Sequence, residues 1–135
     1  DPLCTHVDAP CPLHTMTAAQ ALQEGRPLAL LVATPAFCST AYCGPTLDTL
    51  LESVGARSAG NATDPVAFIH VEPYANPREG QGLSDPGLRL APALAELGLE
   101  FEPSLFLVDR SGVLVDRIDN VFDRAELDEV LVQLA

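Results

Sequence analysis

The chain has 135 residues, the length of one ordinary domain, and its 7 basic and 19 acidic residues give a formal net charge of −12. This negative balance argues against a nucleic-acid-binding protein, which needs a concentrated positive surface, and against docking on an anionic membrane. The longest apolar run covers residues 28–33, far fewer than the roughly 18 residues of a membrane-spanning helix. A chain of this size can bury a core without metal or disulfide support. Its four cysteines therefore need another explanation.

Residues 1–25 are predicted to form an N-terminal arm with one short helix. The first 15 residues are rich in proline, histidine and cysteine, which indicates an irregular segment. Thr17 is a suitable N-cap for a helix that ends before Gly25. Residues 26–135 are predicted to form a single domain.

Two continuous apolar runs, residues 28–33 and 66–71, are typical of strands buried on both faces of a sheet. Between them, Pro45 favours the first turn of a helix. An apolar helical face follows, and Gly55 and Gly60 are predicted to end this helix. The face consists of Leu47, Leu50, Leu51 and Val54.

The second half of the chain predicts one helix, a hairpin and a last helix. Pro92 is expected to begin the first of these helices and Gly98 to end it. Residues 104–108 and 113–118 are predicted strands joined by a tight turn, and Asp123 is a predicted N-cap for the last helix. After the arm, the order β-α-β-α-β-β-α predicts a mixed four-stranded sheet with helices on both faces.

Cys38 and Cys43 flank a short loop between the first predicted strand and its helix. Unpaired N–H groups and the dipole at a helix N-terminus stabilise a thiolate, and a second thiol five positions away can close a disulfide. A dithiol oxidoreductase needs such a nucleophile and such a resolving thiol. Four cysteines in two close pairs also favour an oxidising compartment outside the cytoplasm: periplasmic, cell-surface or secreted.

Two segments resemble the thioredoxin family. Residues 42–45, Tyr-Cys-Gly-Pro, resemble the aromatic-Cys-Gly-Pro part of the thioredoxin active site. Residues 102–112 resemble the segment that carries a cis-proline, a strand and a hairpin turn. With the order of elements, residues 26–135 resemble the thioredoxin-like proteins, especially the extracytoplasmic ones of bacteria.

The resemblance implies a thioredoxin-like α/β fold, a cis Glu102–Pro103 bond and thiol–disulfide exchange on a protein partner. No cofactor beyond the two cysteines would be needed. The residues expected to frame the active site are Tyr42, Gly44, Pro45, Glu102 and Pro103. A carboxylate at Glu102 would oppose a nearby thiolate by like-charge repulsion, which predicts a less acidic nucleophile and suits an electron donor.

The cysteine spacing departs from the family pattern. Thr46 stands where the second cysteine of C-x-x-C would follow, and the spacing is C-x4-C. Either Cys43 is the nucleophile and Cys38 resolves, or the roles are reversed; the helix start favours Cys43 as the more acidic thiol. The alternative is a redox-inactive interaction module in which a Cys38–Cys43 disulfide is structural.

A copper chaperone of the Sco type is a further alternative, because those proteins carry C-x3-C after the first strand. Residues 68–73 resemble the exit of their second strand only faintly, and no histidine follows His70 to act as a copper ligand. His70 itself is interpreted as a neutral histidine in a buried strand.

The arm contains four residues that could bind zinc: Cys4, His6, Cys11 and His14. Their C-x6-C spacing does not fit the usual C-x2–4-C of zinc sites. An oxidising compartment would instead close a local disulfide between Cys4 and Cys11. The sequence therefore predicts that disulfide and no metal site.

Overall fold

The structure is a computed structural model that describes residues 4–38, 41–60, 63–75, 89–99 and 102–134. Its centre is a four-stranded sheet in the order β2-β1-β3-β4. The strands are β1 (Leu28–Val32), β2 (Ala67–Val71), β3 (Ser104–Val108) and β4 (Leu114–Asp119). Strands β1 and β2 are parallel, whereas β3 runs antiparallel to both β1 and β4.

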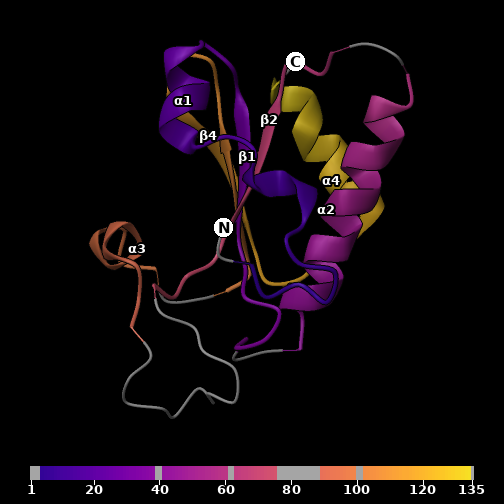
Figure 1. The fold of residues 1–135 in the computed structure, drawn as a ribbon. Coiled ribbons are helices and arrows are strands. Elements are labelled where there is room, and N and C mark those ends of the chain that lie inside the picture. Colours follow the sequence, from indigo (N-terminus) through magenta and orange to yellow (C-terminus); the bar gives the residue numbers. More distant parts are fainter. Residues whose placement is uncertain (1–3, 39–40, 61–62, 76–88, 100–101, 135) are drawn as a thin grey trace.

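Helices cover both faces of the sheet (Figure 1). Helices α2 (Cys43–Ser58) and α4 (Arg124–Leu131) lie together on one side, and α1 (Ala18–Gln23) lies on the other. The remaining helices are α3 (Pro92–Glu96) and the 3-10 turns η1 (Pro12–His14) and η2 (Val132–Leu134). In the described part of the chain, no helix is long and apolar enough to cross a membrane.

The side chains of β1 alternate between two cores, because successive residues of a strand point to opposite faces. Ala29 and Leu31 pack with α2, α4 and β3 in the larger core. Leu28 and Leu30 pack with α1 and β2 in the smaller one. This two-sided burial explains why the first strand reads as a continuous apolar run.

Local signals set most helix ends as predicted. The Thr17 hydroxyl accepts a hydrogen bond from the Gln20 amide and caps α1. Asp123 caps α4 in the same way through the Glu126 amide. Gly25 and Gly98 follow α1 and α3 with positive φ angles of 65° and 61°, which glycine adopts at little cost.

Of the two glycines predicted to end α2, Gly60 does follow the helix, whereas Gly55 lies inside it, because the helix continues to Ser58. Packing against the sheet and α4 holds the helix together across this residue, and a single glycine in a helix costs only about 1 kcal/mol. Residues 73–87 are rich in Pro, Gly and Asn, which predicts a long loop, and most of this segment lies outside the described residues.

The mixed sheet with helices on both faces is the thioredoxin-like α/β fold predicted from the sequence. The N-terminal arm packs onto this fold, and its Cys11 and Leu13 belong to the larger core. The Thr5 hydroxyl and amide both donate to the Glu72 carboxylate just after β2. The division of the chain at residue 25 stays a prediction.

Candidate active site

Cys38 and Cys43 form a disulfide with an S–S distance of 2.09 Å and a Cα–Cα distance of 6.0 Å. The predicted pairing of these two cysteines is therefore confirmed. Cys43 is the first residue of α2 and is fully buried, whereas Cys38 is half-buried in the loop before the helix. Cys38 is therefore the more exposed cysteine of the pair.

Local structure on either side of the loop fixes this arrangement. After β1, the Phe37 amide donates to the Thr34 carbonyl and turns the chain. At the other end, the Thr46 amide donates to the Tyr42 carbonyl and closes the first turn of α2. Tyr42 is the N-cap residue, and its side chain is 45% exposed beside the disulfide-bonded Cys43.

The predicted cis-proline faces the disulfide. The Glu102–Pro103 bond is cis, as predicted, and the Glu102 carbonyl oxygen lies 4.0 Å from the Cys38 sulfur. Pro103 is buried at the entry to β3. The structure thus brings the backbone at residue 102 to the more accessible sulfur of the pair.

Two aromatic residues that the sequence analysis missed lie near this site. Phe37 packs edge-on against Tyr74, with ring centroids 6.3 Å apart. Burial and the negative charge of Glu102 both raise the pKa of Tyr74. The charge of Glu102 therefore acts on the Tyr74 hydroxyl. The position of Phe37 next to Cys38 in the sequence was the one available signal.

The predicted disulfide between Cys4 and Cys11 is not formed, and both are free cysteines. Their sulfurs turn toward His70 of β2, at 3.8 Å and 3.4 Å from its Nδ1. Burial is the main cause that raises the pKa of the Cys11 thiol, to about 11. The arm thus packs its cysteines against a strand instead of closing on itself.

His70 is a buried histidine, 2% exposed, as interpreted from the sequence. Its Nε2 lies 2.8 Å from the Ala33 carbonyl oxygen, so this nitrogen carries the proton of the neutral ring. Burial lowers the pKa of His70 and that of His14, whose Nε2 lies 3.1 Å from Nδ1 of His70. His14 and the two arm cysteines therefore all lie beside the imidazole of His70.

The remaining histidine of the arm does not join this group. His6 lies 2.9 Å from the carboxylate of Asp48 on α2. Cys4, Cys11, His14 and His70 thus form a cluster, with one potential ligand atom each and all four atoms within 4.8 Å of one another. Sequence spacing pointed to His6 and missed His70, which is distant in the chain.

The sheet order, the disulfide at the start of α2 and the cis-proline that faces it define a thioredoxin-like fold with a disulfide-forming cysteine pair. No family model and no curated protein matches the chain. Among solved structures, it is similar to thioredoxin O2 from Arabidopsis thaliana in the oxidized state, at 24% identity. The similarity covers 86% of this chain and 84% of that one, with a TM-score of 0.46.

Proposed function

We propose that the protein is a thiol–disulfide oxidoreductase that acts on protein partners outside the cytoplasm through Cys38 and Cys43. One observation carries this proposal: the half-buried Cys38 sulfur lies beside the cis-proline backbone, whereas its partner is buried at a helix start. An inert bridge gains little from this placement, since closing so short a loop stabilises a fold by only about 2 kcal/mol.

The geometry gives the two sulfurs different roles. A partner thiolate attacks the Cys38 sulfur, a mixed disulfide forms, and the Cys38–Cys43 bond breaks with Cys43 leaving as a thiolate. The N–H groups and dipole at the start of α2 stabilise this leaving group. A second thiolate of the partner then displaces Cys38. The partner is oxidised by two electrons, and the protein is left with two reduced thiols.

The same steps run in reverse when the reduced protein donates electrons. The Cys38 thiolate then attacks a partner disulfide, and Cys43 resolves the mixed disulfide. From its place at the helix start, Cys43 was predicted to be the more acidic thiol. An acidic thiol suits the role of leaving group as well as that of nucleophile. Exposure assigns the attacking role to Cys38 in this proposal.

The surroundings of Cys38 support a polypeptide as the partner. The backbone at Glu102 faces the sulfur and can pair with an extended segment, a mode in which main-chain hydrogen bonds supply affinity. Tyr42 adds an exposed aromatic ring at the helix start, and such rings are enriched at protein interfaces. The Cys38–Cys43 disulfide fits an oxidising compartment.

A matched pair of single-cysteine variants tests the assignment. Oxidised glutathione should form a mixed disulfide readily with Cys43→Ser, in which the accessible Cys38 is free, and much more slowly with Cys38→Ser. Mass spectrometry after a timed quench measures both rates. Equal rates, or faster capture by Cys43, would contradict the assignment of Cys38 as the attacking thiol.

A redox titration distinguishes catalysis from the alternative, a redox-inactive interaction module in which the bridge is structural. The full burial of Cys43 is the observation that favours this alternative. The folded protein is equilibrated in graded thiol buffers, and the Cys38–Cys43 disulfide is quantified by mass. A midpoint near −270 to −120 mV is expected of an exchange protein, whereas a bridge that resists reduction below about −300 mV is structural.

A further inference from the structure

Four potential metal ligands meet where the arm packs on β2. Cys4 precedes η1, Cys11 is the residue just before it, and His14 is its last residue. His70 comes from β2, an edge strand of the sheet. Their ligand atoms all lie within 4.8 Å of one another. We propose that this cluster is a tetrahedral zinc site that fastens the N-terminal arm to the domain, a role separate from exchange at Cys38 and Cys43.

The tautomer of His70 directs a lone pair into the cluster. Its Nε2–H donates to the Ala33 carbonyl, which can only accept, so Nδ1 is left unprotonated. A hydrogen bond from the second ring nitrogen to a backbone carbonyl is the usual support of a zinc-binding histidine. The support is rigid here, because Ala33 directly follows β1.

Three groups converge on this single lone pair. His14 Nε2 lies 3.1 Å from His70 Nδ1, Cys11 Sγ lies 3.4 Å away and Cys4 Sγ lies 3.8 Å away. One imidazole nitrogen can accept a proton from only one of them. An ion at the centre engages all four atoms at once.

The three distances from His70 are close to the edges of a zinc tetrahedron. Bonds of about 2.0 Å to nitrogen and about 2.3 Å to sulfur give edges of about 3.3 Å between two nitrogens and about 3.5 Å between nitrogen and sulfur. The corresponding distances from His70 are 3.1 Å to nitrogen and 3.4 and 3.8 Å to the sulfurs. The four ligand atoms lie within 4.8 Å of one another, and the longest edge of a zinc tetrahedron, between two sulfurs, is about 3.8 Å. Closing the site therefore requires a side-chain movement of about 1 Å.

The charge and burial of the cluster also suit zinc. Two thiolates and two neutral imidazoles around Zn²⁺ sum to zero, so the site can be buried without a net charge. Cys11 and His70 are 4% and 2% exposed. Binding displaces the two thiol protons into solvent. The Cys11 amide donates to the Cys4 sulfur, an N–H to sulfur bond that stabilises a thiolate ligand.

Tetrahedral S2N2 sites of this kind select zinc over magnesium, calcium and manganese, which prefer oxygen ligands. A Cys4–Cys11 disulfide would bond the two sulfurs to each other and would not explain why two imidazoles lie against them. With zinc bound, the arm is cross-linked to β2 through residues 59 and 66 positions apart. The metal would add to the Thr5–Glu72 hydrogen bonds, which already join the arm to the end of β2.

The test uses the full chain, purified under mild reductant, with Co²⁺ as a spectroscopic substitute for Zn²⁺. We expect one Co²⁺ per chain, with the intense visible absorption of a tetrahedral site and a sulfur-to-metal charge-transfer band. Binding of Co²⁺ to the metal-free protein should release two protons, and one equivalent of Zn²⁺ should then displace the Co²⁺ without further proton release. Saturating Zn²⁺ at about 1,000 times its Kd should raise Tm by roughly 10 °C.

Matched histidine variants identify the ligands. His14→Asn should weaken Co²⁺ binding by at least about 100-fold, because it removes a ligand. His6→Asn, in the same arm but paired with Asp48, should leave the affinity within about twofold. A Cys38→Ser/Cys43→Ser variant should bind Co²⁺ with the same spectrum. Circular dichroism of each metal-free variant verifies its fold.

Three results would overturn the proposal. One is absence of 1:1 Co²⁺ binding by the reduced, folded protein. Another is equal weakening by His6→Asn and His14→Asn. The third is loss of the spectrum when only Cys38 and Cys43 are replaced, since the metal would then sit at the exchange site. None of these results depends on thiol–disulfide exchange, so the two proposals stand or fall separately.

Discussion

The carboxylate of Glu102 lies one residue before the cis-proline that faces the accessible sulfur. The backbone carbonyl oxygen of Glu102 is 4.0 Å from Cys38 Sγ, and the charge of its carboxylate acts on Tyr74. A fixed negative charge near a thiolate makes that thiolate harder to form. The effect of the Glu102 carboxylate on the cysteine stays a prediction.

Replacing Glu102 by Gln should make the Cys38 thiol more acidic and speed its alkylation at pH 7, because the like-charge repulsion is removed. The rise of thiolate absorbance with pH, followed in reduced protein, measures the change. The shift should shrink at 1 M salt, where the Debye length is only about 3 Å. An unchanged titration in low salt would show that Glu102 does not affect the acidity of the cysteine and is only a residue at the entry to β3.

Thr46 occupies the position of the second cysteine in the C-x-x-C pattern and is fully buried. Its hydroxyl oxygen has no hydrogen-bond partner within the described part of the chain. Burying an unpaired polar atom costs roughly 1–3 kcal/mol. Thr46→Val keeps the shape and removes this atom.

We therefore expect Thr46→Val to raise the free energy of unfolding by about 1 kcal/mol, measured by urea denaturation of the oxidised protein. Thr49→Val is the matched control on the same helix, because the Thr49 hydroxyl donates to the Pro45 carbonyl and is exposed. Its effect should stay within about 0.5 kcal/mol of zero. A loss of stability in Thr46→Val would show that the buried hydroxyl is hydrogen-bonded.

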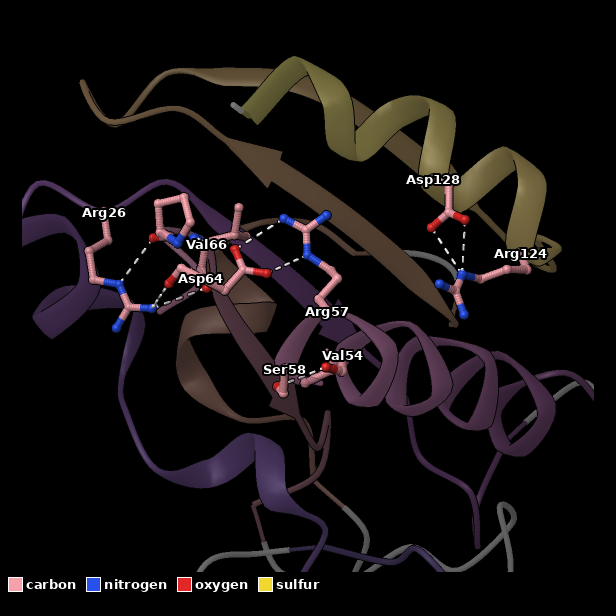
Figure 2. Close-up of polar contacts among 9 residues, drawn as sticks. Arg26, Val54, Arg57, Ser58, Asp64, Val66, Arg124 and Asp128 are labelled. Carbon is pink, nitrogen blue, oxygen red and sulfur yellow. Dashed lines mark hydrogen bonds and ion pairs between the residues drawn. The ribbon is translucent and has the colours of Figure 1, made fainter. Parts of the chain in front are cut away.

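Helix α2 is held at both ends. The disulfide anchors its first residue, and Arg57 in its last turn pairs with Asp64 before β2 (Figure 2). The Asp64 carboxylate also accepts from the Val66 amide at 3.0 Å, while Arg26 donates to the backbone carbonyls of residues 64–66. These contacts tie the helix end to the strand beside β1.

The hydrogen bond from Arg57 is the main cause that lowers the pKa of Asp64. A carboxyl with a lowered pKa in the folded state stabilises the fold above its ordinary pKa, and this contribution is lost as the pH falls through the folded-state pKa. Asp64→Asn should therefore lose about 1 kcal/mol at pH 7, after allowance for partial exposure. At pH 2 its stability should approach that of the unmodified protein.

Urea denaturation at a series of pH values measures the difference. Asp128→Asn is the matched control, because Asp128 pairs with Arg124 one turn away on the exposed face of α4 (Figure 2). An exposed pair of this kind contributes about 0.3–0.5 kcal/mol at most. A pH-independent loss in Asp64→Asn would assign the effect to the backbone bond of Val66 instead of to charge.

The N-terminal arm belongs to the main core of the molecule. Leu13 is 4% exposed and packs in the cluster that joins the sheet to α2 and α4. The arm is also held by Thr5 at Glu72 and Ala36 and by His6 at Asp48. The loop that leads to Cys38 is therefore packed against the arm.

Leu13→Ala should lower the free energy of unfolding by roughly 2–4 kcal/mol, because it leaves a cavity in a shared core. Leu97→Ala, at a position 63% exposed, should change it by less than about 0.5 kcal/mol. Thermal unfolding with excess EDTA measures both without any metal contribution. Equal effects would show that the arm does not pack in the core in solution.

Much of this fold could be predicted from the sequence, because its signals are local. The capping residues Thr17 and Asp123 satisfy backbone N–H groups within their own turns. The continuous apolar run of β1 follows from burial on both faces of the sheet. The Cys38–Cys43 pairing needed only five residues of separation and a helix start.

Tertiary structure decided what local signals could not. Which sulfur of the pair is accessible depends on how α2 packs on the sheet, and Gly55 remains helical because of that same packing. The partner of the arm cysteines is His70, which follows Cys11 by 59 residues. No spacing rule reaches that far, because only the folded sheet brings the arm and β2 together. Burial of His70 and Cys11 then favours polar groups that satisfy one another.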